Sequence, residues 1–111
     1  MGRAIETGDV FAAISAPVRR EMLSLLSGRE LAVSSLAESF DMTLGAVSQH
    51  LGVLRDAGLV SVRRDGKQRF YRLDPTPLRS VAEWVDRYGP FWSEKLDSLG
   101  DYLDETSKEE L

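Results

Sequence analysis

Apolar residues recur at steps of three and four through the first half of the chain, the spacing of helices that bury one face. Ser15 is the expected N-cap of a second helix, and Pro17 is expected in its first turn. Gly28 is expected to end this helix. Thr43 is the expected N-cap of a later helix, and Gly58 stands where a left-handed residue would close it. The pattern therefore predicts four helices, over residues 9–14, 17–28, 33–40 and 44–57.

The pattern then changes to alternation over residues 60–64 and 69–73, which is typical of half-buried strands and predicts a hairpin. Two registers keep the apolar faces matched. A two-residue Asp-Gly turn would place Val62 opposite Arg69, whereas a four-residue loop places Val62 opposite Tyr71. The second register is preferred because it pairs apolar side chains across the strands.

Apolar positions at steps of three and four predict a last helix over residues 77–103. Gly89-Pro90 interrupts it, because proline removes an internal hydrogen bond, so we expect one kinked helix or two nearly collinear ones. The acidic end, residues 105–111, is expected to fray. The fold class is therefore mainly α with a small β-hairpin (α+β), in a single domain over residues 1–104 that has helices at both ends, about 8–14 and 77–103.

The net charge of −4 at first argues against a nucleic-acid partner, but the charge is unevenly distributed. Residues 43–73 carry a net charge of +4, and residues 74–111 carry −6. A local basic patch can bind phosphate whatever the total charge of the protein. The charge pattern therefore keeps nucleic acid open as a partner.

Composition excludes several kinds of site. The 111 residues include no cysteine and one histidine, His50, so thiolate metal sites, disulfides and a multi-histidine site within one chain are excluded. We see no His–Asp–nucleophile set and no glycine loop for phosphate, so we expect neither an enzyme nor a cofactor. No stretch resembles a signal peptide or approaches the about 20 apolar residues of a membrane span, which favours the cytoplasm over the membrane.

Two helices joined by a three-residue turn and followed by a basic hairpin have the order of a winged helix-turn-helix. On the helix over 44–57, Val47, Leu51 and Leu54 share one face. The opposite face is small or polar where Lys and Glu would be usual: Gly45, Ser48, Gln49 and Gly52. Such a face lets a helix approach the floor of the DNA major groove closely.

The run over residues 47–60 reads Val-Ser-Gln-His-Leu-Gly-Val-Leu-Arg-Asp-Ala-Gly-Leu-Val, and a basic hairpin ending Phe70-Tyr71-Arg72-Leu73 follows it. Together with Ala16-Pro17-Val18-Arg19 upstream, this resembles the ArsR/SmtB family of bacterial transcription regulators over about residues 8–103. The resemblance implies a homodimeric, sequence-specific DNA-binding regulator in the bacterial cytoplasm, associated with the nucleoid. It is expected to repress by binding a pseudo-palindromic operator in competition with RNA polymerase.

Two departures from the family pattern concern metal sensing. Where many members have a cysteine pair, this chain has Ala32 and Ser34, and its last helix has no histidine. The aromatic ending over residues 84–99 resembles a metal-independent subgroup of small repressors. Metal sensing is therefore not carried over, no metal ligand is expected, and the effector is unknown.

The candidate DNA contacts fall on two elements. On the recognition helix they are Thr43, Leu44, Gly45, Ser48, Gln49 and His50, and on the wing they are Arg63, Arg64, Lys67, Gln68 and Arg69. Plainer alternatives remain: Thr43 as a helix cap, Ser48 and Gln49 as ordinary surface residues, and the wing as a solvated hairpin. His50 is expected to bond a backbone carbonyl or a phosphate, and Arg19 and Arg20 are candidates for ion pairs with nearby acids.

Apolar positions on the first and last helices exceed what a monomer of this size can cover. The candidate dimer interface is Val10, Phe11, Ile14, Val81, Trp84, Val85, Tyr88, Trp92, Leu96 and Leu99. The same residues could instead form intrachain core, and the aromatic cluster could enclose an apolar ligand. The alternative function is a winged-helix module for protein–protein contact without a DNA function.

Overall fold

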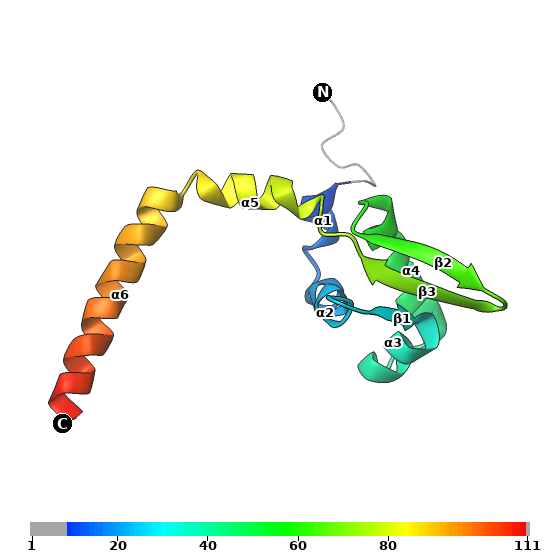
Figure 1. The fold of residues 1–111 in the computed structure, drawn as a ribbon, viewed down its shortest axis with the longest axis horizontal. Helices are drawn as coiled ribbons and strands as arrows, with labels where there is room; N and C mark the ends of the chain where they lie inside the picture. Colours follow the sequence, from blue (N-terminus) through cyan, green and yellow to red (C-terminus); the bar gives the residue numbers. More distant parts are fainter. Residues whose placement is uncertain (1–8, 111) are drawn as a thin grey trace. The chain divides into compact units, whose positions relative to one another are not determined.

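The computed structural model describes residues 9–110, including all side chains of that range except those of 93 and 104–110. The chain packs as two units that divide between Val81 and Ala82, inside the helix α5, where the sequence predicts one domain over 1–104. The described elements are α1 (Val10–Ala13), α2 (Pro17–Leu25), β1 (Glu30–Ala32), α3 (Val33–Phe40), α4 (Leu44–Asp56), β2 (Val60–Asp65), β3 (Gln68–Leu73), α5 (Leu78–Asp86) and α6 (Gly89–Glu110) (Figure 1). This confirms the predicted α+β winged helix-turn-helix.

Local signals set the helix starts. Pro17 occupies the first turn of α2 as predicted, but the N-cap is Ala16 and not Ser15. The Ser15 hydroxyl instead donates to the Ala12 carbonyl at 2.7 Å, because α1 ends directly upstream and its last carbonyls accept bonds from outside the helix. For α4 the prediction is confirmed, since the Thr43 hydroxyl accepts the Ala46 N–H at 3.1 Å.

The end of α4 is closed by a glycine in the left-handed region, as the sequence predicts. Gly58 has a φ of +77°, which an L side chain rarely adopts. Its N–H donates to the Arg55 carbonyl, and the Leu59 N–H donates to the Leu54 carbonyl, both at 2.9 Å. These two bonds make a Schellman motif, so α4 stops where the wing must begin.

The sheet has three antiparallel strands in the order β1-β3-β2. The preferred hairpin register is confirmed, with Val62 opposite Tyr71. The ladder continues to Asp65 opposite Gln68, so the connection is a two-residue turn and not the expected four-residue loop. The strand β1 was not predicted, because three residues are too few to show an alternating pattern.

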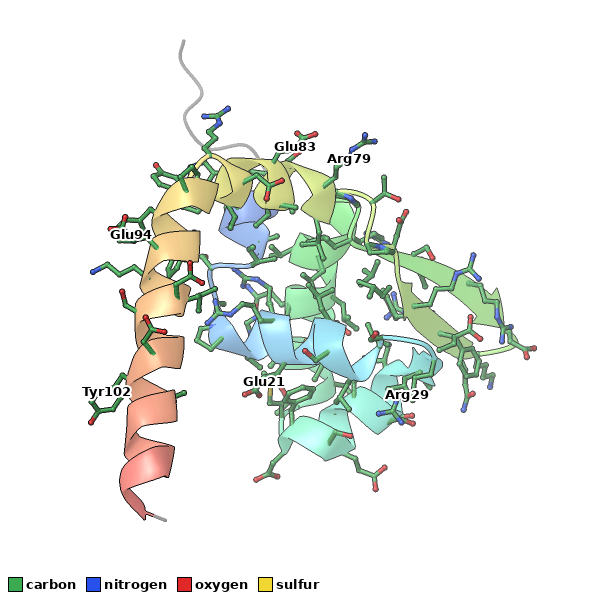
Figure 2. All side chains as sticks on the ribbon, turned by 60° about the vertical axis from the view of Figure 1, so that its left-hand side comes forward. Glu21, Arg29, Arg79, Glu83, Glu94 and Tyr102 are labelled. Atoms are coloured by element: carbon green, nitrogen blue, oxygen red, sulfur yellow. The ribbon has the colours of Figure 1, made fainter. Side chains whose placement is uncertain are left out.

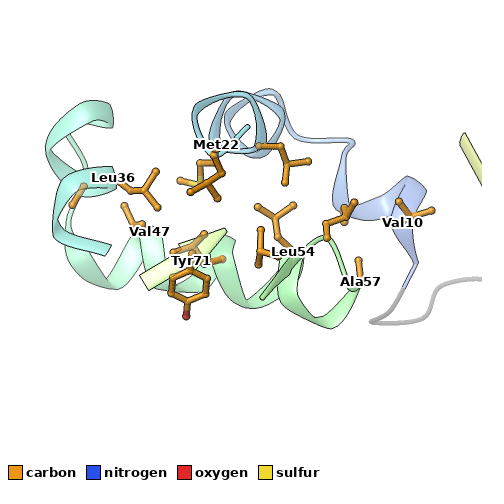
Figure 3. Packing of buried hydrophobic residues seen from close by; sticks show 14 residues of the cluster. Val10, Met22, Leu36, Val47, Leu54, Ala57 and Tyr71 are labelled. Carbon is orange, nitrogen blue, oxygen red and sulfur yellow. The ribbon is translucent and has the colours of Figure 1, made fainter. Parts of the chain in front are cut away.

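Charged side chains such as Glu21 and Arg29 lie on the outside of the winged-helix unit (Figure 2). Inside it, side chains from α1 to α4 and from the sheet meet in one core between α2 and α4 (Figure 3). Val47, Leu51 and Leu54 of α4 are fully buried there, as the sequence predicts. The opposite face of α4 is therefore turned outward by the packing itself.

The predicted last helix is two helices, α5 and α6. Hydrogen bonds from Arg87 N–H to the Trp84 carbonyl (3.2 Å) and from Tyr88 N–H to the Val85 carbonyl (2.9 Å) close α5. Pro90 then falls in the first turn of α6, where its missing N–H costs nothing. The helix continues to Glu110, past the predicted end at 103 and through most of the segment expected to fray. None of the described helices has the length and apolarity to cross a membrane.

Candidate nucleic-acid interface

The N-terminal half of α4 presents the residues that the sequence assigns to a recognition helix. Thr43, Gly45 and Gln49 are exposed and Ser48 is half-buried. Leu44 is 57% exposed, so its apolar side chain is available on the surface at the start of the helix. The face of α4 opposite the core thus carries mostly small or polar side chains that solvent can reach.

A surface groove joins this face to the wing. Leu44 and Ser48 line one side of it, Lys67, Gln68 and Arg69 line the other, and residues 32–34 also contribute to its walls. The groove has a volume of about 280 Å³. The fold therefore brings together, in one concave surface, side chains from the two elements that the sequence assigned to DNA contact.

Strand alternation divides the wing cations between two faces. Arg64 and Arg69 lie directly opposite each other, on the face that carries Val62 and Tyr71. Like charges in such a pair destabilise a hairpin. Within the part of the chain that the structure describes, the guanidinium group of neither arginine has a hydrogen-bond or ion-pair partner. With Lys67 in the turn between them, the inner face of the wing tip is a cluster of uncompensated cations.

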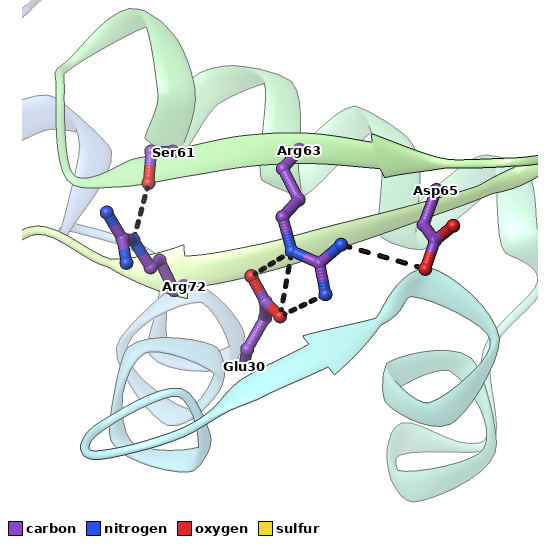
Figure 4. Close-up of polar contacts among 5 residues, drawn as sticks. All are labelled: Glu30, Ser61, Arg63, Asp65 and Arg72. Carbon is purple, nitrogen blue, oxygen red and sulfur yellow. Dashed lines mark hydrogen bonds and ion pairs between the residues drawn. The ribbon is translucent and has the colours of Figure 1, made fainter.

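Arg63 lies on the outer face and is engaged there. Its guanidinium donates to the carboxylate of Glu30, with Nη2 to Oε1 at 2.8 Å, and it lies 3.8 Å from a carboxylate oxygen of Asp65 (Figure 4). The hydrogen bond and the charge of Arg63 hold the pKa of Glu30 below its ordinary value, outweighing desolvation. The sequence grouped Arg63 with the other wing cations, but the structure gives it a different neighbourhood.

His50 contacts an arginine and not a backbone carbonyl. The Arg19 guanidinium donates to the carbonyls of Ala13 (2.6 Å) and Ala12 (3.2 Å), and its Nη1 lies 3.3 Å from His50 Nδ1. Because arginine can only donate, Nδ1 is the acceptor in this contact. Arg20 likewise donates to the Ile14 carbonyl at 2.7 Å. Both arginines therefore bond the carbonyls at the end of α1, and among the described residues neither forms the ion pair with an acid that was one candidate role for it.

Comparison with known proteins agrees with this geometry. Residues 16–62 match the family model described as "Bacterial regulatory protein, arsR family". The transcriptional repressor SdpR of Bacillus subtilis is 36% identical over 69% of this chain and 86% of its own length. The HTH-type transcriptional regulator Rv2034 of Mycobacterium tuberculosis is 38% identical over 83% of each chain. The chain belongs to the ArsR family.

A solved ArsR-like transcriptional regulator from Rhodococcus sp. RHA1 has the same fold, with a TM-score of 0.66 and 30% identity, over 86% of this chain and 88% of that one. This ArsR-family protein is thus a winged-helix, DNA-binding transcription regulator. The resemblance to the ArsR family found in the sequence is confirmed.

The positions at which metal-sensing ArsR proteins would hold cysteine are on the groove wall here. Ala32 and Ser34 line the groove, and neither offers a thiolate. Among the residues that the structure describes, no group of three or more His, Cys, Asp or Glu side chains could hold a metal ion.

The candidate dimer residues of this ArsR-family chain separate into two sets. Val10 is 9% exposed in the core of the winged-helix unit, and Ile14 and Val81 pack against that core, so these three serve the chain's own packing. The others are between 41% and 62% exposed: Phe11, Trp84, Val85, Tyr88, Trp92, Leu96 and Leu99. Within the second unit, an apolar hollow of about 370 Å³ is lined by Trp84, Val85, Tyr88, Phe91 and Trp92.

Proposed function

We propose that this ArsR-family regulator is a homodimeric repressor of a pseudo-palindromic operator, acting in the bacterial cytoplasm on the nucleoid. The observation that carries the proposal is the groove between α4 and the wing, which joins a small, polar helix face to uncompensated cations. A two-fold dimer places two such faces on successive half-sites. Bound there, the protein excludes RNA polymerase. That relatives carry the name of repressors supports this direction of regulation.

Each element of the groove has its own role in this proposal. The major groove admits one helix, and α4 enters it with its N-terminal half. Gln49 and Ser48 bond base edges, and Leu44 contacts a thymine methyl group. Thr43 caps the helix, whose N-terminus then lies near a phosphate. The cations Arg64, Lys67 and Arg69 contact phosphates, which positions the protein without reading sequence.

A footprint on the DNA upstream of the protein's own gene tests the proposal. The purified chain is expected to protect two half-sites, one helical turn or a multiple of it apart. A duplex of the same length with both half-sites scrambled is the control. Absence of any duplex binding, even at low salt, would contradict the proposal and favour the protein–protein module.

Gln49→Ala is expected to relax base preference at one position of each half-site. Glutamine can bond an adenine edge through two atoms, and its loss costs about 1–3 kcal/mol of discrimination there. Binding to a set of operators that vary one base pair at a time measures the change. If the variant discriminates among these operators as the wild type does, Gln49 does not read sequence.

Gly52→Ala is expected to stabilise the fold while weakening DNA binding. Apart from its chain neighbours and the backbone of its own helix, a Cβ at Gly52 would meet no described atom within 4 Å, so packing against other elements does not require glycine. Alanine in a helix interior is favoured over glycine by about 0.5–1 kcal/mol. Thermal unfolding and operator affinity measure the two effects.

Ser24→Ala, on the exposed side of α2, is the control for Gly52→Ala, since it raises helix propensity away from the groove. It is expected to leave DNA affinity unchanged. If Gly52→Ala bound the operator as tightly as the wild type, α4 would not approach DNA closely at this position.

A further inference from the structure

The outer face of the wing carries an ion pair that crosses a whole strand. Glu30 belongs to the edge strand β1 and Arg63 to β2, with β3 between them. Arg63 Nε lies 3.1 and 3.0 Å from the two carboxylate oxygens of Glu30, and Nη2 lies 2.8 Å from Oε1. A guanidinium bound to a carboxylate through two nitrogens has a defined direction as well as a favourable energy.

The Arg63 guanidinium also contacts an aromatic ring of the strand between β1 and β2. Its central carbon lies 4.8 Å from the centroid of the Phe70 ring, on the strand that the ion pair crosses. This is the distance of a cation–π contact. Asp65 approaches from the tip side at 3.8 Å. Arg63 thus remains 55% exposed, yet Glu30, Asp65 and the Phe70 ring constrain its side chain on three sides. Figure 4 shows the contacts with Glu30 and Asp65.

The place of the pair in the sheet indicates what it constrains. The last rung that β1 makes with β3 is Ala32 opposite Phe70, and Arg63 stands opposite Phe70 on the other side. Beyond this rung the wing is a ribbon of two strands, which is marginally stable by itself. That ribbon also contains the opposed cations Arg64 and Arg69.

Glu30, the acidic partner, lies on the strand that continues into the helix-turn-helix. β1 runs directly into α3, because Ala32 is both the last residue of the strand and the N-cap of the helix. A link from Arg63 to Glu30 therefore joins the base of the free ribbon to the first helix of the motif. In this way it can set where the wing tip lies relative to α4.

We propose that Arg63 is a positioning residue, held by Glu30, that sets the wing for DNA binding and does not itself contact phosphate. The proposal rests on the DNA-binding function proposed above. The simpler alternative, that Arg63 is one more phosphate contact and Glu30 a nearby repulsive charge, makes opposite predictions.

Three variants distinguish the positioning role from a phosphate contact: Glu30→Gln, Arg63→Gln and the double variant. Each single variant is expected to weaken operator binding several-fold. The operator affinity of the double variant should be no lower than that of whichever single variant binds less tightly. The two losses do not add, because either substitution already breaks the pair. The slope of log K against log salt should not change. Since Arg63 lowers the pKa of Glu30, the carboxylate is ionised throughout the pH range of such assays.

Two results would overturn the proposal. One is tighter binding by Glu30→Gln, as expected when a repulsive carboxylate is removed. The other is a slope that Arg63→Gln flattens by about 0.9 per protomer, the effect of one lost phosphate contact. Glu38→Gln, an exposed carboxylate of α3 outside this network, is the matched control and should change affinity little.

A second measurement is independent of DNA. In a nitrogen-15 NMR spectrum, the Arg63 Nε–H should exchange slowly with water in the wild type and rapidly in Glu30→Gln. Rapid exchange in the wild type would overturn the positioning role directly. If the wild type bound no duplex but showed slow exchange, the proposed function would fail while the ion pair itself would stand.

Discussion

Replacing Lys67 and Arg69 by alanine is expected to flatten the slope of log K against log salt by about two units per protomer, hence about four per dimer. Each phosphate that a cation neutralises releases condensed counterions, with a slope near −0.9 per contact. Both side chains line the groove beside α4 and are exposed. Because phosphates carry no sequence information, specific and non-specific binding should weaken together. Affinity across a salt series measures both.

The matched control removes the same charge from the other face of the hairpin. Arg63→Gln with Arg72→Gln deletes two cations from the outer face, where their side chains bond Glu30 and Ser61. This pair of substitutions is expected to lower affinity without changing the slope. An unchanged slope in the Lys67/Arg69 variant would mean that the wing tip is only solvated. A loss confined to one base pair would mean that it reads sequence.

The recognition helix could be predicted from the sequence because every signal for it is local. Thr43 at its start and Gly58 at its end are caps that act through neighbouring backbone groups. The spacing of Val47, Leu51 and Leu54 gives the buried face, and the structure agrees. The exposed face follows from these three positions alone.

The neighbourhood of Arg63 could not be predicted in the same way, because its partner is 33 residues away, on a strand that the pattern does not show. The charge pattern of the sequence assigned Arg63 and Arg64 to the same set of DNA-contacting wing cations. Alternation carried a signal, since adjacent strand residues point to opposite faces, but only the register with β1 identifies Glu30. Arg19 and His50 are similar: they meet because α1, α2 and α4 pack together.

The C-terminal helices have a pattern that predicts burial, but within the chain only the start of α5, at Leu78 and Val81, packs against the core. No described residue of α5 or α6 is buried, although the stripe from Trp84 to Leu99 keeps helical phase. An apolar surface of this kind marks an interaction site on a soluble protein. Because none of the side chains that the structure describes in the second unit is buried, we expect a second copy of the chain to cover this stripe.

Trp92→Glu combined with Leu96→Glu is expected to convert a dimer into a monomer. Both residues lie on the apolar stripe of α6 and are at least half exposed in the single chain, so a charge there costs little until a partner buries it. Sedimentation equilibrium at micromolar concentration should show twice the 12.4 kDa chain mass for the wild type and one chain mass for the variant. A wild type with only the single-chain mass would remove the dimer from the proposal.

Loss of the dimer is also expected to lower operator affinity by about 10²–10⁴-fold, because the second half-site then no longer binds within the same molecule. Binding to an isolated half-site should change little, since the substitutions lie outside the unit that carries α4 and the wing. Glu94→Ala, on the other face of α6, is the control and should leave mass and affinity unchanged. If the charged variant lost half-site binding as strongly as operator binding, α6 would support the winged-helix unit itself. The stripe would then be part of that unit's own packing and not a dimer surface.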